Sequence, residues 1–410
     1  MRLLSVTAIA LLAACSKGAG PSDIVVRDSA GVEIIEHPAS AIAAAPQWNL
    51  GPAEATITHG ATEDAAFSYV ANATRLPDGR IVVVDGQMDG ALVTVHAPDG
   101  SYERSLGRPG MGPGEFMFAG LVGVAGDTLI FYDTRNSRST RMLVSGTLVS
   151  TGELARLGMM AVGTPAGTLA DGRLISTPYF FGDTVDHGHR YRQFAPIIAI
   201  DPVAVHLDTL TTTIPGTEVF MLTGNLGGTT RSFPTPVVYG PRTLISPARE
   251  VVHVASNESS ALDTYSLPWA LQRSVRFAMP RRPVDEEARG AARAAALANI
   301  ERAGSNAEAM KATMIDMIGR AEMADSMAWY AGMGAGSDGS VWLRETRSTS
   351  DSVPHYLVIG KEGRLQGRAD LPKGARLLWV DADRVLISLL DDDEVPRVEL
   401  RPIVKGAPAP

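Results

Sequence analysis

The sequence predicts an all-β fold, a six-bladed β-propeller of four-stranded antiparallel blades with a helical-hairpin insertion. Three observations predict it. Asp-Gly turns separate short apolar runs, the turn-and-strand unit recurs about every 45 residues, and a single alanine- and methionine-rich stretch interrupts the pattern. The composition agrees, because 45% hydrophobic residues, 20% charged residues and 41 glycines are typical of a folded, turn-rich β protein.

The clearest unit spans residues 67–116. Asp78-Gly79 and Asp99-Gly100 are hairpin signals, because a type I′ turn needs positive φ at both central positions. The run Ile81–Val84 is continuously apolar, which indicates a strand buried on both faces. The unit predicts strands at about 67–75, 80–85, 91–97 and 101–107, followed by the Gly/Pro-rich loop GRPGMGPGEF.

Comparable turn-and-strand cores recur along the chain. They begin at Leu76, Ala125, Leu169, Arg249, Gly336 and Asp381. The stretch Thr211–Phe233 lies in a wide interval without an Asp-Gly-strand core, and we interpret it as a long loop. Six blades follow from this count, and seven is the alternative if that interval hides another unit.

Residues 24–36 read as a hairpin with its turn at Ser29-Ala30-Gly31. We expect this hairpin to pair with the last strands, around Val395–Val404, within a propeller that covers 24–405. Such pairing would join the first and last blades and remove exposed sheet edges. The alternative is a separate N-terminal hairpin.

The N-terminus reads as a lipoprotein signal peptide over residues 1–14, with Arg2, an apolar run and then small residues. Cys15, the sole cysteine, follows LAA directly and is predicted to be lipidated, with 15–23 as its tether. LAAC resembles the bacterial lipobox, and Ser16 favours the outer membrane over the inner one. The alternative is an ordinary signal peptide beside a stray cysteine.

Residues 284–328 predict two antiparallel helices inserted within the propeller. Acidic residues follow Pro283 in a first helical turn, and Ser305 and Glu308 have capping-box spacing. The second helix carries an apolar face, which includes Met310, Met314 and Met317. We expect this face to lie on the propeller, either as plain packing or as a lid over a ligand site, since methionine surfaces adapt to varied ligands.

Chemical motifs are sparse. The chain has no zinc-protease helix, phosphate loop, dinucleotide fingerprint or paired-cysteine zinc site, so no catalytic, cofactor-binding or metal residue is assigned, and the cofactor stays unknown. His187-Gly188-His189 and the acidic run Asp391–Glu394 are weak metal candidates that read better as a loop and a turn. The segment Ala335–Gly339 reads as a turn, not a nucleophile elbow, because it precedes a strand.

Candidate ligand contacts are expected in the long connections. They are Tyr179, Phe180, Arg231 and Phe233, together with Met310, Met314 and Met317 of the predicted helix. The net charge of −8 argues against a nucleic-acid partner, which would need a basic stripe.

The repeated units and the GRPGMGPGEF loop resemble six-bladed propellers of the NHL and TolB-like group, and especially bacterial propeller lipoproteins. The resemblance covers about residues 24–405. It implies either a binding scaffold or an enzyme such as a lactonase or an amidating lyase. We therefore expect an exported, lipid-anchored cell-envelope propeller that binds a protein, peptide or glycan. The alternative is a metal-dependent hydrolase or lyase with its site in the central funnel.

Overall fold

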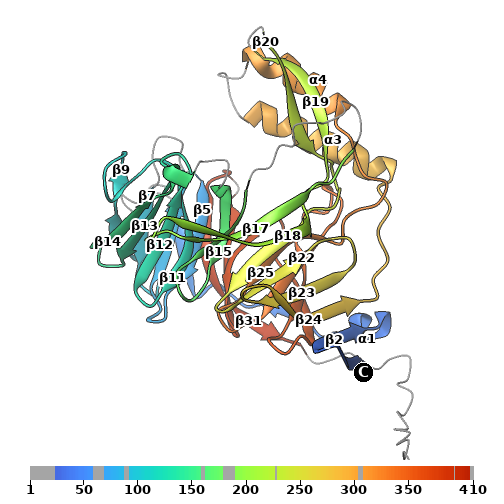
Figure 1. Ribbon diagram of the computed structural model, residues 1–410, viewed down its shortest axis with the longest axis horizontal. Helices are drawn as coiled ribbons and strands as arrows, with labels where there is room; N and C mark the ends of the chain where they lie inside the picture. Colours follow the sequence, from blue (N-terminus) through green and yellow to red (C-terminus); the bar gives the residue numbers. More distant parts are fainter. Residues whose placement is uncertain are drawn as a thin grey trace, which may run out of the picture.

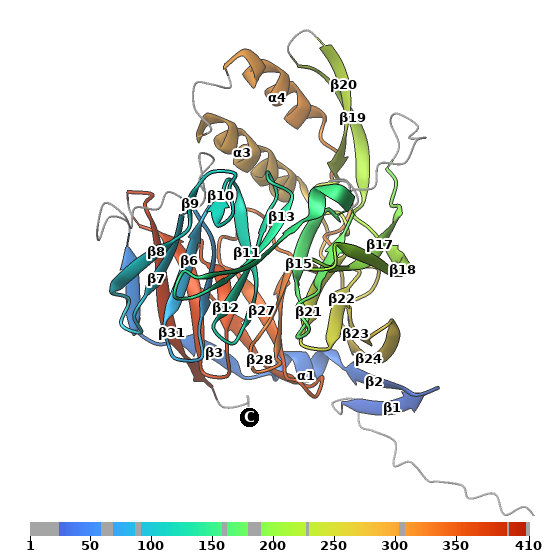
Figure 2. The ribbon, with the colours of Figure 1, turned by 60° about the vertical axis from the view of Figure 1, so that its left-hand side comes forward.

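The computed structural model describes residues 24–58, 69–86, 92–157, 162–178, 190–226, 229–302, 308–391 and 393–406. The fold is mostly β, and its small antiparallel sheets are arranged as in a propeller (Figure 1). The hairpin of β19 (Val219–Leu226) and β20 (Thr229–Pro236) and the helices α3 (Glu286–Arg302) and α4 (Glu308–Arg320) rise from one side of these sheets. The N-terminal hairpin and α1 lie on the other side in both ribbon views (Figure 2).

The first unit forms the four strands that the sequence predicts, within a few residues at each end. They are β5 (Val70–Arg75), β6 (Ile81–Asp85), β7 (Leu92–His96) and β8 (Tyr102–Leu106), in the sheet order β5-β6-β7-β8. The run in β6 is buried on both faces, as predicted. Ile81 and Val83 belong to one hydrophobic cluster, and Val82 and Val84 belong to another.

Two further sheets have the same four-stranded meander. One consists of β11 (Ala119–Ala125), β12 (Thr128–Asp133), β13 (Arg138–Leu143) and β14 (Leu148–Glu153). The other consists of β15 (Thr164–Thr168), β16 (Leu174–Thr177), β17 (Phe194–Asp201) and β18 (His206–Pro215). The short strands β9 (Arg108–Pro109) and β10 (Glu115–Phe116) pair in the GRPGMGPGEF loop.

The remaining strands form larger sheets that contain the same meander. One contains β21 (Leu244–Ala248), β22 (Val251–Ala255), β23 (Ala261–Ser266) and β24 (Ala270–Phe277). A nine-stranded sheet contains β25 (Tyr330–Ala335), β26 (Val341–Glu345), β27 (His355–Ile359), β28 (Leu365–Asp370), β29 (Arg376–Val380), β30 (Arg384–Leu390) and β31 (Pro396–Lys405). The predicted turn-and-strand cores thus form β6, β12, β16, β22, β26 and β30.

The first strand of each meander contacts the first strand of the next. These contacts run in the order β5, β11, β15, β21, β25, β29 and back to β5. Between neighbouring sheets lie apolar clusters, such as the one that joins Trp342 and Tyr356 to Val385 and Ile387. The buried surface of each strand is therefore covered by the adjacent sheet, as expected for radially packed sheets.

The prediction for the N-terminal hairpin is wrong in its partner. β1 (Val25–Ser29) and β2 (Val32–His37) form the expected hairpin, but β2 pairs in parallel with β24 instead of with the last strands. The Arg273 Nε to Glu33 Oε2 distance is 2.6 Å, and Ile34 and Ile35 are buried there. The hairpin extends an internal sheet because its apolar face fits that edge.

The next segment makes the connection to the last strands. After α1 (Ala39–Ala43), β3 (Gln47–Leu50) pairs with both β28 and β31, and β4 (Ala55–Thr58) pairs antiparallel with β31. Ala55 and Ile57 face the core, while Thr56 and Thr58 are exposed. The Arg384 Nε to Glu54 Oε2 distance at this junction is 2.7 Å. An early strand thus completes the sheet that contains the last ones.

The turn type at the Asp-Gly pairs also differs from the prediction. Gly79 has φ +95°, but Asp78 does not have positive φ. The Leu76 N–H donates to the Arg80 carbonyl over 2.8 Å, so three residues span the turn, with glycine as the left-handed residue. A two-residue turn with both φ values positive occurs instead at Ala30-Gly31.

The stretch interpreted as a long loop contains strands. β18 ends at Pro215, and β19 (Val219–Leu226) then pairs with β20 (Thr229–Pro236) in a hairpin of its own. The predicted helices are present as α3 (Glu286–Arg302) and α4 (Glu308–Arg320).

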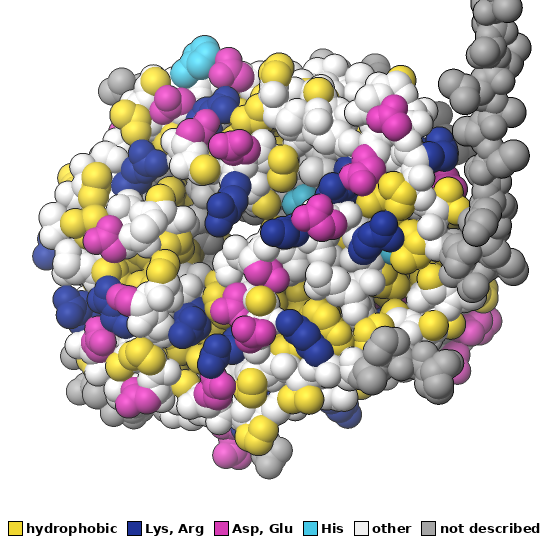
Figure 3. Space-filling view, turned by 90° about the horizontal axis from the view of Figure 1, so that it is seen from below, with side chains coloured by type: hydrophobic (Ala, Val, Ile, Leu, Met, Phe, Trp, Pro, Cys, Tyr) yellow, Lys and Arg dark blue, Asp and Glu magenta, His cyan; other side chains and the backbone are white. Residues whose placement is uncertain are grey.

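Figure 3 shows the molecule from below, where acidic and basic side chains are interspersed with apolar ones.

Candidate functional site

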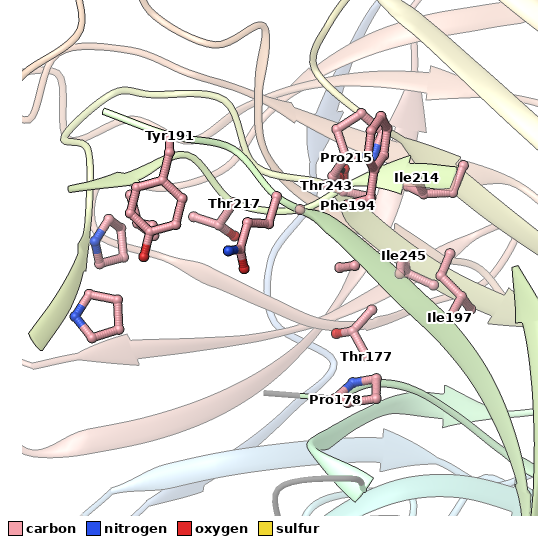
Figure 4. A pocket seen from close by; sticks show the side chains of 16 residues that line it. Thr177, Pro178, Tyr191, Phe194, Ile197, Ile214, Pro215, Thr217, Thr243 and Ile245 are labelled. Carbon is pink, nitrogen blue, oxygen red and sulfur yellow. Dashed lines mark hydrogen bonds between the residues drawn. The ribbon is translucent and has the colours of Figure 1, made fainter. Parts of the chain in front are cut away.

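A pocket of about 390 Å³ lies between the third meander and the base of the β19–β20 hairpin. Figure 4 shows Tyr191 and Thr217 on one side of it and Ile197 and Ile245 on the other. It is lined by Thr177, Pro178, Tyr191, Gln193, Phe194, Ala195, Ile197, Ile214, Pro215, Gly216, Thr217, Val219, Pro234, Pro236, Thr243 and Ile245. This volume is in the range of small-ligand sites in proteins.

Backbone hydrogen bonds fix the mouth of the pocket. Tyr191 and Val219 exchange two backbone hydrogen bonds of 2.9 Å, and the Gly216 N–H donates to the Gln193 carbonyl over 2.7 Å. The Arg192 Nε donates to the Gly216 carbonyl over 2.7 Å. A Cβ on Gly216 would lie 3.0 Å from the Gln193 carbonyl oxygen, so this close approach favours glycine. The segment before β17 and the turn before β19 are therefore held together.

The pocket is apolar with a few neutral polar groups. None of its lining residues carries a formal charge at neutral pH. Four of them are prolines, which have no backbone N–H to donate. Burial raises the pKa of Tyr191, so its hydroxyl is a neutral donor, and it lies 3.7 Å from the Met221 sulfur. Phe194 is 62% exposed at the rim. Such a surface suits an apolar group better than an ion.

The predicted ligand residues are only partly placed. Tyr179 and Phe180 lie outside the described residues, although their neighbour Pro178 lines the pocket. Arg231 and Phe233 belong to β20, but the structure does not describe their side chains. The pocket takes Pro234 and Pro236 from that strand.

The predicted methionine face lies on the β19–β20 hairpin. α4 contacts β19, and the half-buried Met317 packs on a cluster that contains Phe220 and Leu222. A Cβ on Gly224 would lie 3.0 Å from the Met317 sulfur, so the glycine lets the helix approach the strand closely. Met314 is half-buried on the same helix, and the structure does not describe the side chain of Met310. The face is thus used in packing, and its role as a lid stays a prediction.

Sequence reasoning missed the main pocket residues, Tyr191, Phe194, Pro234 and Pro236. A signal was present in the proline pair of β20, because residues two apart on a strand point to the same face. The two prolines therefore mark one apolar face of an edge strand.

The weak metal candidates are not assembled into a site in the described part of the chain. No group of three or more His, Cys, Asp or Glu side chains is close enough to hold a metal ion in those residues. Asp391 Oδ1 accepts hydrogen bonds from the Asp393 and Val395 N–H groups, so it shapes a turn. His187 and His189 lie outside the described residues. The Gly336 N–H donates to the Ser340 carbonyl over 2.7 Å, which confirms the turn predicted there.

Two comparisons find no relative, and the third finds solved structures that resemble this chain at low sequence identity. No protein-family model matches the chain, and no curated protein matches it. Among solved structures, a protein of Bacteroides fragilis assigned as exported is 11% identical, with a TM-score of 0.49 over 91% of this chain and 100% of its own. A gluconolactonase of Xanthomonas campestris is 12% identical, with a TM-score of 0.40 over 86% and 99%.

TolB of Acinetobacter baumannii is 11% identical, with a TM-score of 0.36 over 80% of this chain and 64% of its own. At such scores these likenesses assign no activity to the chain. Within the part that the structure describes, no helix has the length and apolar character needed to cross a bilayer.

Proposed function

We propose that this protein is an exported, lipid-anchored six-bladed β-propeller that binds an apolar segment of a protein or peptide at the cell envelope. The observation that carries the proposal is the uncharged pocket beside the β19–β20 hairpin. A peptide inserts an apolar side chain there, and its flanking residues contact Phe194 and the hairpin.

A peptide fits this pocket better than a glycan does. A glycan presents many hydroxyl groups, each of which needs a hydrogen-bond partner when it is buried. Only Thr177, Tyr191, Gln193, Thr217 and Thr243 supply polar side chains in the lining. The rest of the surface is apolar, and the prolines reduce the number of backbone donors further.

Six is the blade count that the strand contacts favour. The cycle of first strands passes through β5, β11, β15, β21, β25 and β29, and each of them begins a four-stranded meander or, for β29, a meander that β4 completes. No strand of the β19–β20 hairpin takes part in this cycle of neighbours, so the hairpin does not add a seventh blade.

The lipid anchor is proposed from Cys15 after LAA in the sequence. The first described strand, β1, lies on the side of the molecule opposite to the β19–β20 hairpin (Figures 1 and 2). An anchor that precedes β1 is therefore compatible with an accessible pocket.

The test is a substitution that fills the mouth of the pocket. Thr217 lines the pocket and is exposed, so Thr217→Trp adds bulk there without disturbing the core. Thr212→Trp is the matched control, because Thr212 is exposed on β18 and does not line the pocket. We would select binders from a random peptide library on the full-length protein and then measure their affinities for both variants by fluorescence anisotropy.

The expected result is a set of peptides with a shared apolar residue, which bind the Thr212→Trp variant normally and the Thr217→Trp variant at least about tenfold more weakly. Equal affinities for the two variants, or selected peptides without an apolar consensus, contradict the proposal.

A further inference from the structure

Two arginines lie together where the first strands β21 and β25 meet. Arg242 precedes β21, and its guanidinium donates to the Ala331 carbonyl of β25. Arg344 of β26 pairs in register with Gly332 of β25, the next residue along that strand. Because Ala331 and Gly332 are consecutive residues of β25, Arg242 and Arg344 both lie at the contact between these neighbouring strands.

Glycine at position 332 leaves room for the Arg344 side chain. A Cβ at Gly332 would lie 3.7 Å from the Arg344 Cβ and 3.9 Å from its Cδ, so any larger side chain would cover the stem of the arginine. The Arg344 side chain is exposed, although Leu343 and Glu345 on either side are buried. The strand therefore presents a guanidinium to solvent at this point.

These two positive charges are close enough to repel each other, and no described acid forms an ion pair with either of them. Burial and the charge of Arg344 together lower the pKa of Arg242, and no carboxylate contributes to that shift. The nearby Glu345 is committed elsewhere, since its Oε2 lies 2.5 Å from Arg282 and 2.8 Å from Arg347. No described residue forms a hydrogen bond or an ion pair with the Arg344 side chain.

Arg242 is solvent-accessible even though the surrounding protein lowers its pKa. Partial desolvation weakens the competition from water, so an ion pair with Arg242 is stronger than one on an open face. Two guanidinium groups in such a place offer several N–H donors to one planar or tetrahedral oxyanion.

We propose that Arg242 and Arg344 form a binding site for an oxyanion, a carboxylate or phosphate group. Thr243, which follows Arg242 in the chain, lines the apolar pocket, whereas the Arg242 guanidinium lies at the Ala331 carbonyl of β25. This anion site does not depend on whether the pocket binds a peptide.

The test uses citrate and inorganic phosphate as separate probes of the full-length protein at low ionic strength. Isothermal titration calorimetry measures binding, and the melting temperature gives an independent readout. Arg344→Gln is the informative variant, because Arg344 has no described partner whose loss would destabilise the fold. Arg344→Lys keeps the charge but not the fork of donors. Arg104→Gln is the control, because Arg104 is an exposed arginine 3.9 Å from Glu103 on β8.

The expected result is saturable binding of at least one probe, weakened at least about tenfold by Arg344→Gln, less by Arg344→Lys, and unchanged in Arg104→Gln. Without anions, Arg344→Gln should keep or raise the melting temperature, since it removes a like-charge repulsion. Preference for citrate over phosphate, or the reverse, identifies which oxyanion the site takes.

Two results overturn the inference: no saturable binding of either probe to the unsubstituted protein, or equal affinity in the Arg344→Gln and Arg104→Gln variants. Thr217→Trp separates this inference from the proposed function. Citrate or phosphate binding should survive that substitution even if the pocket binds no peptide.

Discussion

Ile57 gives the sharpest test of how the first and last strands are joined. Its side chain is 3% exposed on β4 and packs in a cluster with Val398 of β31 and with Ile81 and Val83 of β6. Replacing Ile57 with alanine removes three carbon atoms from this cluster without changing the backbone pairing. The substitution therefore measures how firmly β4 is docked between the two sheets.

The magnitude follows from the burial. Each methylene taken out of a fully buried position costs about 0.8 kcal/mol of transfer free energy, so three carbons cost about 2.4 kcal/mol. The remaining cavity adds to this, because surrounding side chains relax only partly, and we expect a total of about 3–4 kcal/mol for Ile57→Ala.

The assay is equilibrium unfolding in urea, followed by tryptophan fluorescence and circular dichroism. Thr56→Ala is the control, because Thr56 is exposed on the same strand, and its effect should stay within about 0.5 kcal/mol. A loss below about 1 kcal/mol for Ile57→Ala, or equal effects of the two substitutions, would refute the docking of β4 as the closing strand.

Three more predictions address the helices, pH and the anchor. Gly224→Ile should displace α4, because a Cβ at this position already lies 3.0 Å from the Met317 sulfur, and hydrogen exchange in α4 should rise. Gly319→Ala is the control, because a Cβ there meets no other atom, and it should stabilise the helix by about 0.5–1 kcal/mol. Burial lowers the pKa of His253 from 6.5 to about 4. The unfolded state therefore binds the proton at a higher pH than the folded state does, and the stability of the fold falls as the pH drops from about 6.5 to about 4. His253→Gln should lose less stability in urea unfolding over the same window, and an equal loss contradicts this. Cys15→Ser should block lipidation and release the protein from membranes, as checked by detergent partitioning, with unchanged partitioning as the contrary result.

The strands with strong local signals could be predicted from the sequence. The apolar run of β6 and the glycine turn before it at Gly79 indicate the strand and its burial, and the predicted bounds of 80–85 agree with the observed Ile81–Asp85. The same holds for β26, where Gly339 with φ +86° opens the strand. These signals are local, so no tertiary information was needed.

The β19–β20 hairpin was missed because we looked for Asp-Gly turns. The sequence between its strands is Gly227-Gly228, a glycine pair that is also a hairpin signal. β19 does carry an apolar run, Val219–Leu222, but no Asp-Gly turn precedes it, and the threonine-rich β20 lacks such a run. The hairpin is two-stranded, and α4 packs on it. The pocket was missed with it, since the hairpin supplies Val219, Pro234 and Pro236.

The partner of each N-terminal strand could not be predicted from local pattern. Both β2 and β4 have buried aliphatic residues that suit any open sheet edge. What selects β24 for β2 is long-range, namely the ion pair of Arg273 with Glu33 and the stacking of His37 on Phe277. A single sequence does not reveal such matches over hundreds of residues.

The junction of β4 with β31 has a consequence for how the chain is made. Glu54 and Arg384 are 330 positions apart, so this contact forms only after nearly the whole propeller has been synthesised. Contacts between such distant segments raise the contact order and slow folding. Until β31 emerges, β4 has no partner strand, and the nascent chain keeps an open edge that a chaperone or a translocation machinery can hold.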